Sequence, residues 1–112
     1  MAVVINRNQL EPDGNGYLFH GKEHGGTSVS FIYVDNEPGG GPRLHQHGYD
    51  EVFVILEGNV TFTVGGEEVK ASAGDVVVGP ANVPHKFVND GPGALRQVDI
   101  HATDHIVTEW LE

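Results

Sequence analysis

The chain contains no cysteine, so it has neither disulfides nor thiolate metal ligands. It also has no apolar run near the roughly 18 residues that a membrane span needs. Its first residues, MAVVINRNQLEPDG, lack the basic start and the long apolar segment of a secretion signal. From these absences we expect a cytoplasmic protein with no membrane partner.

Basic residues are scarce, with 6 lysines and arginines against 16 acidic residues and a formal net charge of -10. An acidic protein repels the phosphates of nucleic acids, so we expect no nucleic-acid partner. The same charge disfavours a strongly anionic substrate, although Arg43 and Lys86 lie near the motifs described below and could offset it locally. Solubility alone also accounts for such acidity.

Helical periodicity is missing before the last nine residues, and short alternating or apolar segments separated by turn residues predict strands instead. The fully apolar segment 76–78 is expected in the core, and Gly65-Gly66 is expected to form a two-residue hairpin turn. Many short strands in 112 residues predict one all-β domain, residues 1–112, built as a sandwich or closed barrel. Besides the strands that carry the histidines, the expected strands are 2–5, 17–20, 27–34, 59–64, 67–71, 76–78 and 94–101.

Residues 39–58, GGGPRLHQHGYDEVFVILEG, place His45 and His47 two positions apart and Glu51 four positions further on. Alternate residues of a strand share a face, so the two imidazoles project together, and Glu51 leans toward them from the start of the next strand. Imidazole and carboxylate are the ligands that borderline divalent metals take when no thiolate is offered. A second block, GDVVVGPANVPHKFVN, supplies His85 as the candidate fourth ligand.

These two blocks resemble the two-motif signature of the cupin family. The glycine, His-x-His, glutamate and closing glycine of the first motif are read here as Gly39, His45, His47, Glu51 and Gly58. The glycine, proline, histidine and asparagine of the second are read as Gly74, Pro80, His85 and Asn89. Asn82 stands where the family usually has glycine. Because asparagine tolerates a left-handed backbone better than other residues with a side chain, we expect the turn to survive.

The resemblance implies that the all-β domain is a double-stranded β-helix, that is, a jelly-roll barrel. It also implies one divalent transition-metal ion, Mn, Fe, Ni, Co, Cu or Zn. Ions that take five or six ligands would keep positions for water, dioxygen or a chelating substrate, whereas zinc would leave a more closed site. Taken singly, each histidine reads as a polar surface or core residue; the joint spacing is what favours metal binding. The implied ligands are His45, His47, Glu51 and His85.

Other side chains are candidates for the surroundings of the metal. Tyr49, in the turn between His47 and Glu51, is expected either at the entrance of the site or as a surface aromatic. Alternation places four apolar residues on the inward face, where they either wall the site or pack as ordinary core. These four residues are Phe53, Ile55, Phe62 and Phe87.

Asp99 and His101 form the remaining polar pair on one strand face. If this face looks into the barrel, the pair would orient a metal ligand or relay protons. If it looks outward, both are solvent residues, and the pattern of Val98 and Ile100 on the opposite face is equally natural for that arrangement.

A small cupin with an intact ligand set resembles metal-dependent dioxygenases of the quercetinase-like kind, and this is the leading prediction. One alternative is a metal-dependent isomerase, decarboxylase or lyase acting on a small oxygenated acid or sugar. Another is a non-catalytic cupin that binds or senses a small ligand, as in transcription regulators. Such a sensor would need a separate partner, since nothing in this sequence is suited to reading DNA. Family membership alone does not choose among these reactions.

The two ends of the chain predict a homodimer. Ala2 to Ile5 reads as an apolar strand with no hairpin partner beside it, and Trp110 and Leu111 add apolar surface at the other end. A barrel of this size has little interior left for them, so a twofold interface would bury both ends. Cupins commonly pair in this way. The alternative is that both ends fold back on their own barrel.

Overall fold

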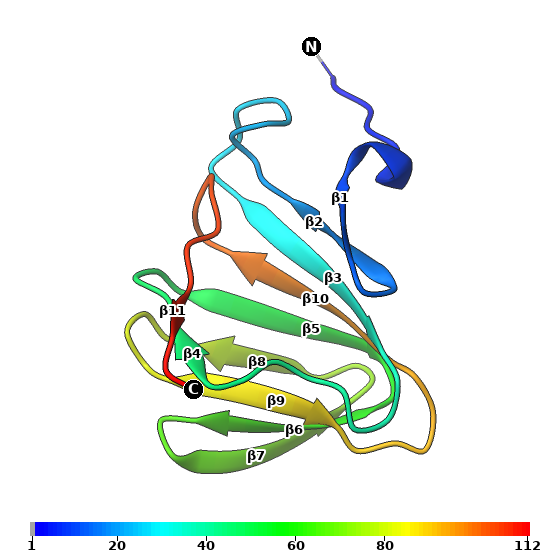
Figure 1. Ribbon diagram of the computed structural model, residues 1–112, viewed down its shortest axis with the longest axis vertical. Coiled ribbons are helices and arrows are strands. Elements are labelled where there is room, and N and C mark those ends of the chain that lie inside the picture. The colour runs from blue at the N-terminus through cyan, green and yellow to red at the C-terminus, as the bar shows by residue number, and fades with distance from the viewer. Residues whose placement is uncertain (1) are drawn as a thin grey trace.

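Two antiparallel β-sheets face each other in the computed structural model, which describes residues 2–112 (Figure 1). One sheet has the strand order β1-β2-β3-β10-β5-β8, and the other has the order β11-β4-β9-β6-β7. The chain passes repeatedly between the sheets, which confirms the predicted all-β jelly-roll. The elements are η1 (Arg7–Gln9), β1 (Glu11–Asp13), β2 (Gly16–Phe19), β3 (Ser30–Asn36), β4 (His45–Gln46), β5 (Glu51–Glu57), β6 (Asn59–Val64), β7 (Glu67–Ser72), β8 (Val76–Gly79), β9 (His85–Asn89), β10 (Leu95–His101) and β11 (Glu109–Trp110).

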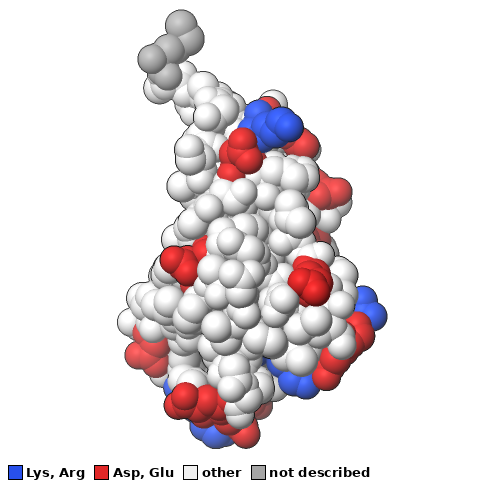
Figure 2. Space-filling view, turned by 90° about the vertical axis from the view of Figure 1, so that its left-hand side faces the viewer, with Lys and Arg blue, Asp and Glu red and all other residues white. Residues whose placement is uncertain are grey.

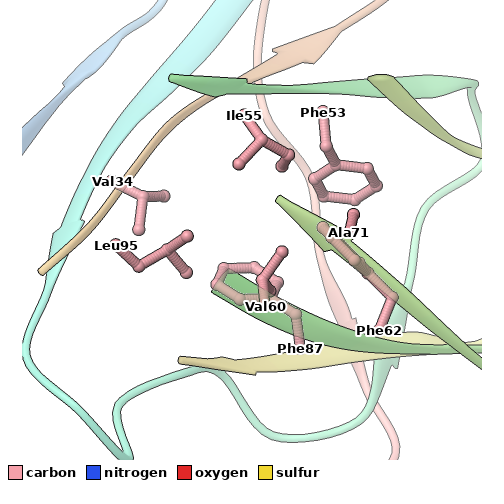
Figure 3. Packing of buried hydrophobic residues seen from close by; sticks show 8 residues of the cluster. All are labelled: Val34, Phe53, Ile55, Val60, Phe62, Ala71, Phe87 and Leu95. Atoms are coloured by element: carbon pink, nitrogen blue, oxygen red, sulfur yellow. The ribbon is translucent and has the colours of Figure 1, made fainter. Parts of the chain in front are cut away.

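The hydrophobic core fills one part of the space between the sheets. Figure 3 shows its side chains reaching toward one another from both sheets. Ring centroids of Phe62 lie 4.7 Å from Phe53 and 5.4 Å from Phe87, within the range of favourable aromatic pairs. Burying each such side chain stabilises the fold by about 1.5–3 kcal/mol. The core residues are Val34, Phe53, Ile55, Val60, Phe62, Ala71, Phe87 and Leu95.

The strands that supply the core also supply buried polar side chains further along the same faces. Strand β10 buries Leu95 and then Gln97, Asp99 and His101, while its intervening residues are only half-buried. Asp99 pairs with Phe53 of β5 and with Ile32 of β3, so its side chain shares the inward face of the sheet. The alternative in which Asp99 and His101 face solvent is therefore wrong.

Two other expectations about strands are wrong. Residues Ala2 to Ile5 form no strand, and Val4 is 93% exposed, because no neighbouring strand is placed to pair with them. The segment 76–78 forms strand β8, but at the edge of its sheet, with Val76 60% and Val78 58% exposed. Those two side chains point away from the core, and only Val77 packs against it.

The hairpin prediction is confirmed, since β6 and β7 pair and both Gly65 and Gly66 have positive φ. The C-terminal segment is extended: β11 pairs with β4 and lies beside it in Figure 1. Leu111 N–H donates to the carbonyl oxygen of Leu44, and Leu44 N–H donates to the Glu112 carboxylate. This end of the chain thus folds back on its own barrel. Within residues 2–112, no helix has the length and apolar character to cross a membrane.

Candidate metal centre

The four predicted ligands come together at one end of the core. Each offers one ligand atom, and these atoms all lie within 4.8 Å of one another. His45 on β4 pairs with His85 at the start of β9, and Glu51 begins β5. All four side chains are buried. The four residues, His45, His47, Glu51 and His85, form a cluster that can hold a metal ion.

His47 lies in the turn between β4 and β5, and the second motif holds its backbone. The backbone N–H of Asn82 donates to the His47 carbonyl oxygen at 2.7 Å. Asn82 has φ 62, so it adopts the left-handed conformation expected of the residue that replaces the usual glycine. The turn survives the replacement, as predicted.

Backbone carbonyls determine which ring nitrogens of two histidines are free. Nδ1 of His45 lies 2.7 Å from the Arg43 carbonyl oxygen, and Nδ1 of His47 lies 2.8 Å from that of Val107. A carbonyl oxygen only accepts hydrogen bonds, so each Nδ1 carries the proton and donates it. Each Nε2 is then left with its lone pair, which is the arrangement typical of metal-ligating histidines.

The geometry of the cluster fits a metal ion better than it fits hydrogen bonding. Oε1 of Glu51 lies 3.2 Å from Nε2 of His47 and 3.1 Å from Nε2 of His85. These three atoms are buried and have no hydrogen-bond partner among the described residues. Two atoms that bind one ion at about 2.0–2.2 Å and at right angles lie about 3 Å apart. Buried polar atoms without partners are costly, and an ion between them would satisfy all three.

The charges of the cluster support this fit. Burial raises the pKa of Glu51, but contacts with His101, His47 and His85 outweigh it and hold that pKa below its usual range. Burial lowers the pKa of His45, which favours its neutral form. For His47, burial acts in the same direction, but its contacts with Glu51 and Val107 raise the pKa overall. An ionised carboxylate beside imidazoles is the form in which such groups bind metal.

Tyr49 and His101 hold the other side of the Glu51 carboxylate. Nε2 of His101 lies 3.1 Å from Oε2 of Glu51, and Nδ1 of His101 lies 2.8 Å from the Tyr49 hydroxyl. The same hydroxyl lies 3.0 Å from Nδ1 of His47. The one proton on Nδ1 of His47 faces both the Val107 carbonyl oxygen and the Tyr49 hydroxyl oxygen, so the hydroxyl is free to donate its own proton to Nδ1 of His101. Burial raises the pKa of Tyr49 to about 12, so its hydroxyl remains protonated.

A cavity of about 450 Å³ opens over the cluster. Of the candidate neighbours, Phe87, Asp99 and His101 line this cavity, whereas Phe53, Ile55 and Phe62 pack in the core. Phe53 still supports the site, since its ring meets that of His85 edge to face at 5.5 Å. Burial, and then the charge of Glu51, raises the pKa of Asp99 well above its usual value.

Several residues that line the cavity were not predicted from the sequence. Trp110, expected at a dimer interface, lines the cavity, and its ring centroid lies 5.0 Å from that of His45. Asp13, which reads as a loop residue in the sequence, reaches the same cavity from the end of β1. Neither had a local signal, because only the pairing of β11 with β4 and of β1 with β2 brings them here. The further lining residues not predicted are Leu18, Ile32, Val34, Asn36, Gly41, Pro42, Ile106 and Thr108.

Residues 32–101 match the family model of the cupin domain. The chain belongs to the cupin family. The match contains both motifs and most of the strands that build the metal cluster, so the resemblance stated from the motifs is confirmed.

Curated relatives of this cupin include regulators, enzymes and proteins without a described activity. It is 28% identical over 104 residues to the HTH-type transcriptional regulator PuuR of Escherichia coli, an alignment covering 88% of this chain and 56% of that protein. It is 38% identical over 64 residues to quercetin 2,3-dioxygenase of Bacillus subtilis, covering 54% of this chain and 19% of that enzyme. The chain therefore spans about half, or much less, of the length of these relatives.

Solved structures share the fold. An oxalate decarboxylase of Lactobacillus farciminis, in complex with formate, superposes with a TM-score of 0.82 over 93% of this chain and 34% of its own length, at 23% identity. Oxalate decarboxylase from Bacillus subtilis gives a TM-score of 0.82 over 94% of this chain and 30% of its own length, at 24% identity. At these identities the likeness establishes the jelly-roll fold alone.

Proposed function

We propose that this cupin binds one divalent transition-metal ion and acts as a quercetinase-like dioxygenase on a small oxygenated organic substrate. The supporting observation is that buried, unpartnered nitrogen and oxygen atoms converge where a 450 Å³ cavity begins. A metal bound there would supply Lewis acidity and redox capacity at a position open to substrate. The similarity to quercetin 2,3-dioxygenase supports this class of reaction. The proposed ligands are His45, His47, Glu51 and His85.

The residues around the cluster prepare the site for such a substrate. His101 and Tyr49 fix the orientation of Glu51, so that Oε1 faces the other ligands while Oε2 faces His101. Apolar side chains of Val34, Ile106 and Phe87 line the cavity and limit the access of water. Because water is excluded, the effective dielectric constant is lower and the electrostatic interactions between the site and a bound molecule are stronger.

The carboxylate ligand bears on the choice of metal. A hard oxygen ligand beside three imidazoles favours Mn or Fe over the metals that a purely histidine set prefers. Oxalate decarboxylase of Bacillus subtilis, which shares the fold, has Mn(II) centres. Elemental analysis of the purified protein identifies the native metal.

Metal content and oxygen uptake test the proposal. The variant His47→Ala should lose most of its metal while keeping the circular dichroism of a β protein. The control variant His105→Ala changes an exposed histidine outside the cluster and should retain metal. Oxygen uptake is then screened with catechols, flavonols and β-dicarbonyls. An unchanged metal stoichiometry in His47→Ala would sink the ligand assignment.

A second candidate function is ligand binding without turnover, and the alignment with the PuuR regulator over 88% of this chain favours it. A binding module would change the visible spectrum of the cobalt-substituted protein when a chelating ligand is added, yet release the ligand unaltered. Turnover that consumes no oxygen would instead support the isomerase, decarboxylase or lyase alternative. Product analysis with and without oxygen separates the three.

The homodimer remains a prediction, although the structure changes both of the observations on which it was based. The N-terminal strand that was expected to lie in the interface does not form, and the C-terminal segment packs on its own barrel. Apolar surface for association remains at Val76 and Val78 on the edge strand β8. Sedimentation at micromolar concentration tests it, since a mass of 12.0 kDa for the full chain would rule the dimer out.

A further inference from the structure

The cavity over the metal cluster is lined by acidic side chains and, among the described residues, by no lysine or arginine. Besides Glu51, two carboxyl groups line it, those of Asp13 and Asp99. Among residues 2–112, no lysine or arginine contributes to the lining. The sequence left open that Arg43 or Lys86 offsets the acidity near the motifs, but both are engaged elsewhere.

Both basic residues have other partners. The guanidinium of Arg43 lies 5.1 Å from the ring centroid of Trp110, and Arg43 itself is exposed. The ammonium of Lys86 lies 3.6 Å from the Glu112 carboxylate. Neither residue lines the cavity, so a bound metal would face a ligand there without a lysine or arginine beside it.

Asp99 is the deeper of the two carboxyl groups. It is 2% exposed, and Nε2 of Gln97 donates to its Oδ1 at 2.8 Å. Asp13 lies nearer the surface at the end of β1, in the same sheet, and its charge contributes to the raised pKa of Asp99. The two groups therefore act on one region of the cavity.

A carboxylate in a buried place is stabilised by a cation beside it, so a ligand that brings a positive charge gains free energy in this cavity that a neutral ligand does not. A ligand with an additional carboxylate would gain no such contact. Acidic residues outnumber basic ones by 16 to 6, and Figure 2 shows acidic side chains at several places on the visible face, so the overall field of the protein also attracts cations. The remaining wall is largely apolar, formed by Leu18, Ile32, Val34, Phe87, Ile106 and Trp110.

We propose that the cavity selects a ligand that chelates the metal through oxygen atoms and carries an ammonium group on a short apolar arm, which Asp99 and Asp13 receive. This inference rests on the proposed metal site and specifies its substrate class. The metal holds the oxygen end, the apolar wall covers the arm, and the two carboxyl groups discriminate by charge.

Three catechols with the same chelating group test the selection. 4-Ethylcatechol has a neutral arm, dopamine carries an ammonium group, and 3,4-dihydroxyphenylacetate carries a carboxylate. Each is titrated into cobalt-substituted protein, followed by visible absorption and by calorimetry, with cobalt content measured beforehand. We expect dopamine to bind about 10-fold more tightly than 4-ethylcatechol, since a hydrogen bond to a charged group contributes about 1.5–3 kcal/mol. The carboxylate compound should bind more weakly than both.

Variants assign the discrimination to the two residues. Asp99→Asn and Asp13→Asn should each reduce the preference for dopamine over 4-ethylcatechol, with cobalt content unchanged. Glu68→Gln removes the same charge from an exposed position on β7 and should leave the preference intact. Asp13 is exposed, so its variant keeps the test decisive even if Asp99→Asn folds poorly.

Two results would overturn the inference while leaving the metal site in place. One is equal affinity for dopamine and 4-ethylcatechol in cobalt-loaded protein. The other is a preference for dopamine that persists unchanged in the Asp13→Asn variant. Protein that takes up no cobalt at all would overturn the metal site, and the inference with it.

Discussion

The variant Tyr49→Phe tests whether an outer hydrogen bond fixes the proposed metal site. It removes a single oxygen atom, the hydroxyl that lies 2.8 Å from Nδ1 of His101 and 3.0 Å from Nδ1 of His47. The phenyl ring can keep its stacking on His47, whose centroid lies 4.9 Å away. His47 also keeps its hydrogen bond to the Val107 carbonyl oxygen. His101, only 1% exposed, loses the partner of its Nδ1.

The change should affect two quantities, the stability of the metal-free protein and its affinity for metal. Leaving a buried polar atom without its partner costs about 1–3 kcal/mol, so metal-free protein should lose that much stability toward unfolding. Losing a partner outside the ligand shell typically weakens metal affinity about 10–100-fold, which corresponds to about 1.4–2.7 kcal/mol. Both losses would have one structural cause, since without the Tyr49 hydroxyl His101 no longer holds Oε2 of Glu51 in one orientation.

Metal affinity is measured by competition with a chelator of known affinity, and stability by urea unfolding in the presence of EDTA. Tyr33→Phe is the matched control: Tyr33 lies on β3, stacks on Tyr17 at 5.3 Å and takes no part in the metal cluster. The reasoning is refuted if Tyr49→Phe binds metal as tightly as Tyr33→Phe.

Three further predictions concern other parts of the site. Glu51→Gln should weaken the binding of Mn and Fe more than that of Cu, and equal losses in metal titrations would show that Glu51 is not a ligand. Gly41→Ala should destabilise the fold by several kcal/mol in thermal unfolding, since its Cβ would lie 1.9 Å from the Phe87 carbonyl oxygen; a native melting temperature would contradict this. Burial raises the pKa of Asp99 in the folded state, so metal-free protein should lose stability as the pH rises above the unfolded pKa of about 3.9. The loss should be about 1.4 kcal/mol per pH unit until the pH reaches the folded pKa. Asp99→Asn should lack this loss in urea unfolding at pH 4 and 7, and an unchanged slope would refute the assignment.

The metal cluster was predictable because its signal is local in the sequence. The spacing of His45, His47 and Glu51 translates directly into one strand, one turn and the start of the next strand. His85 could be added through the second motif, and the pairing of β4 with β9 places it opposite His45. Strand β4 ends at Gln46 and His47 lies in the turn, so the short spacing, and not strand alternation alone, brings the three side chains together.

Strand alternation alone could not decide which face of β10 points inward. Val98 and Ile100 are as apolar as a core face requires, while Gln97, Asp99 and His101 are polar, so the pattern by itself favours the reverse of what is observed. Register decides the matter: Asp99 lies between Ile32 and Phe53, both on the inward face. The prediction that segment 76–78 lies in the core was wrong for a related reason: its apolar composition does not reveal that β8 is an edge strand with one neighbour.

The polar side chains on the inward face of β10 lower the stability of the fold at the site. Gln97 leaves its Oε1 without a partner, Asp99 is buried without a cation, and Nε2 of His101 has only the nearby Glu51 oxygen. An apolar strand would stabilise the barrel better, since each of these groups is expensive to bury. The same strand buries Leu95 fully in the core, so the core end offsets the cost of the polar end. Asp99 and His101, held inward on β10, line the cavity and are positioned to contact a ligand that binds there.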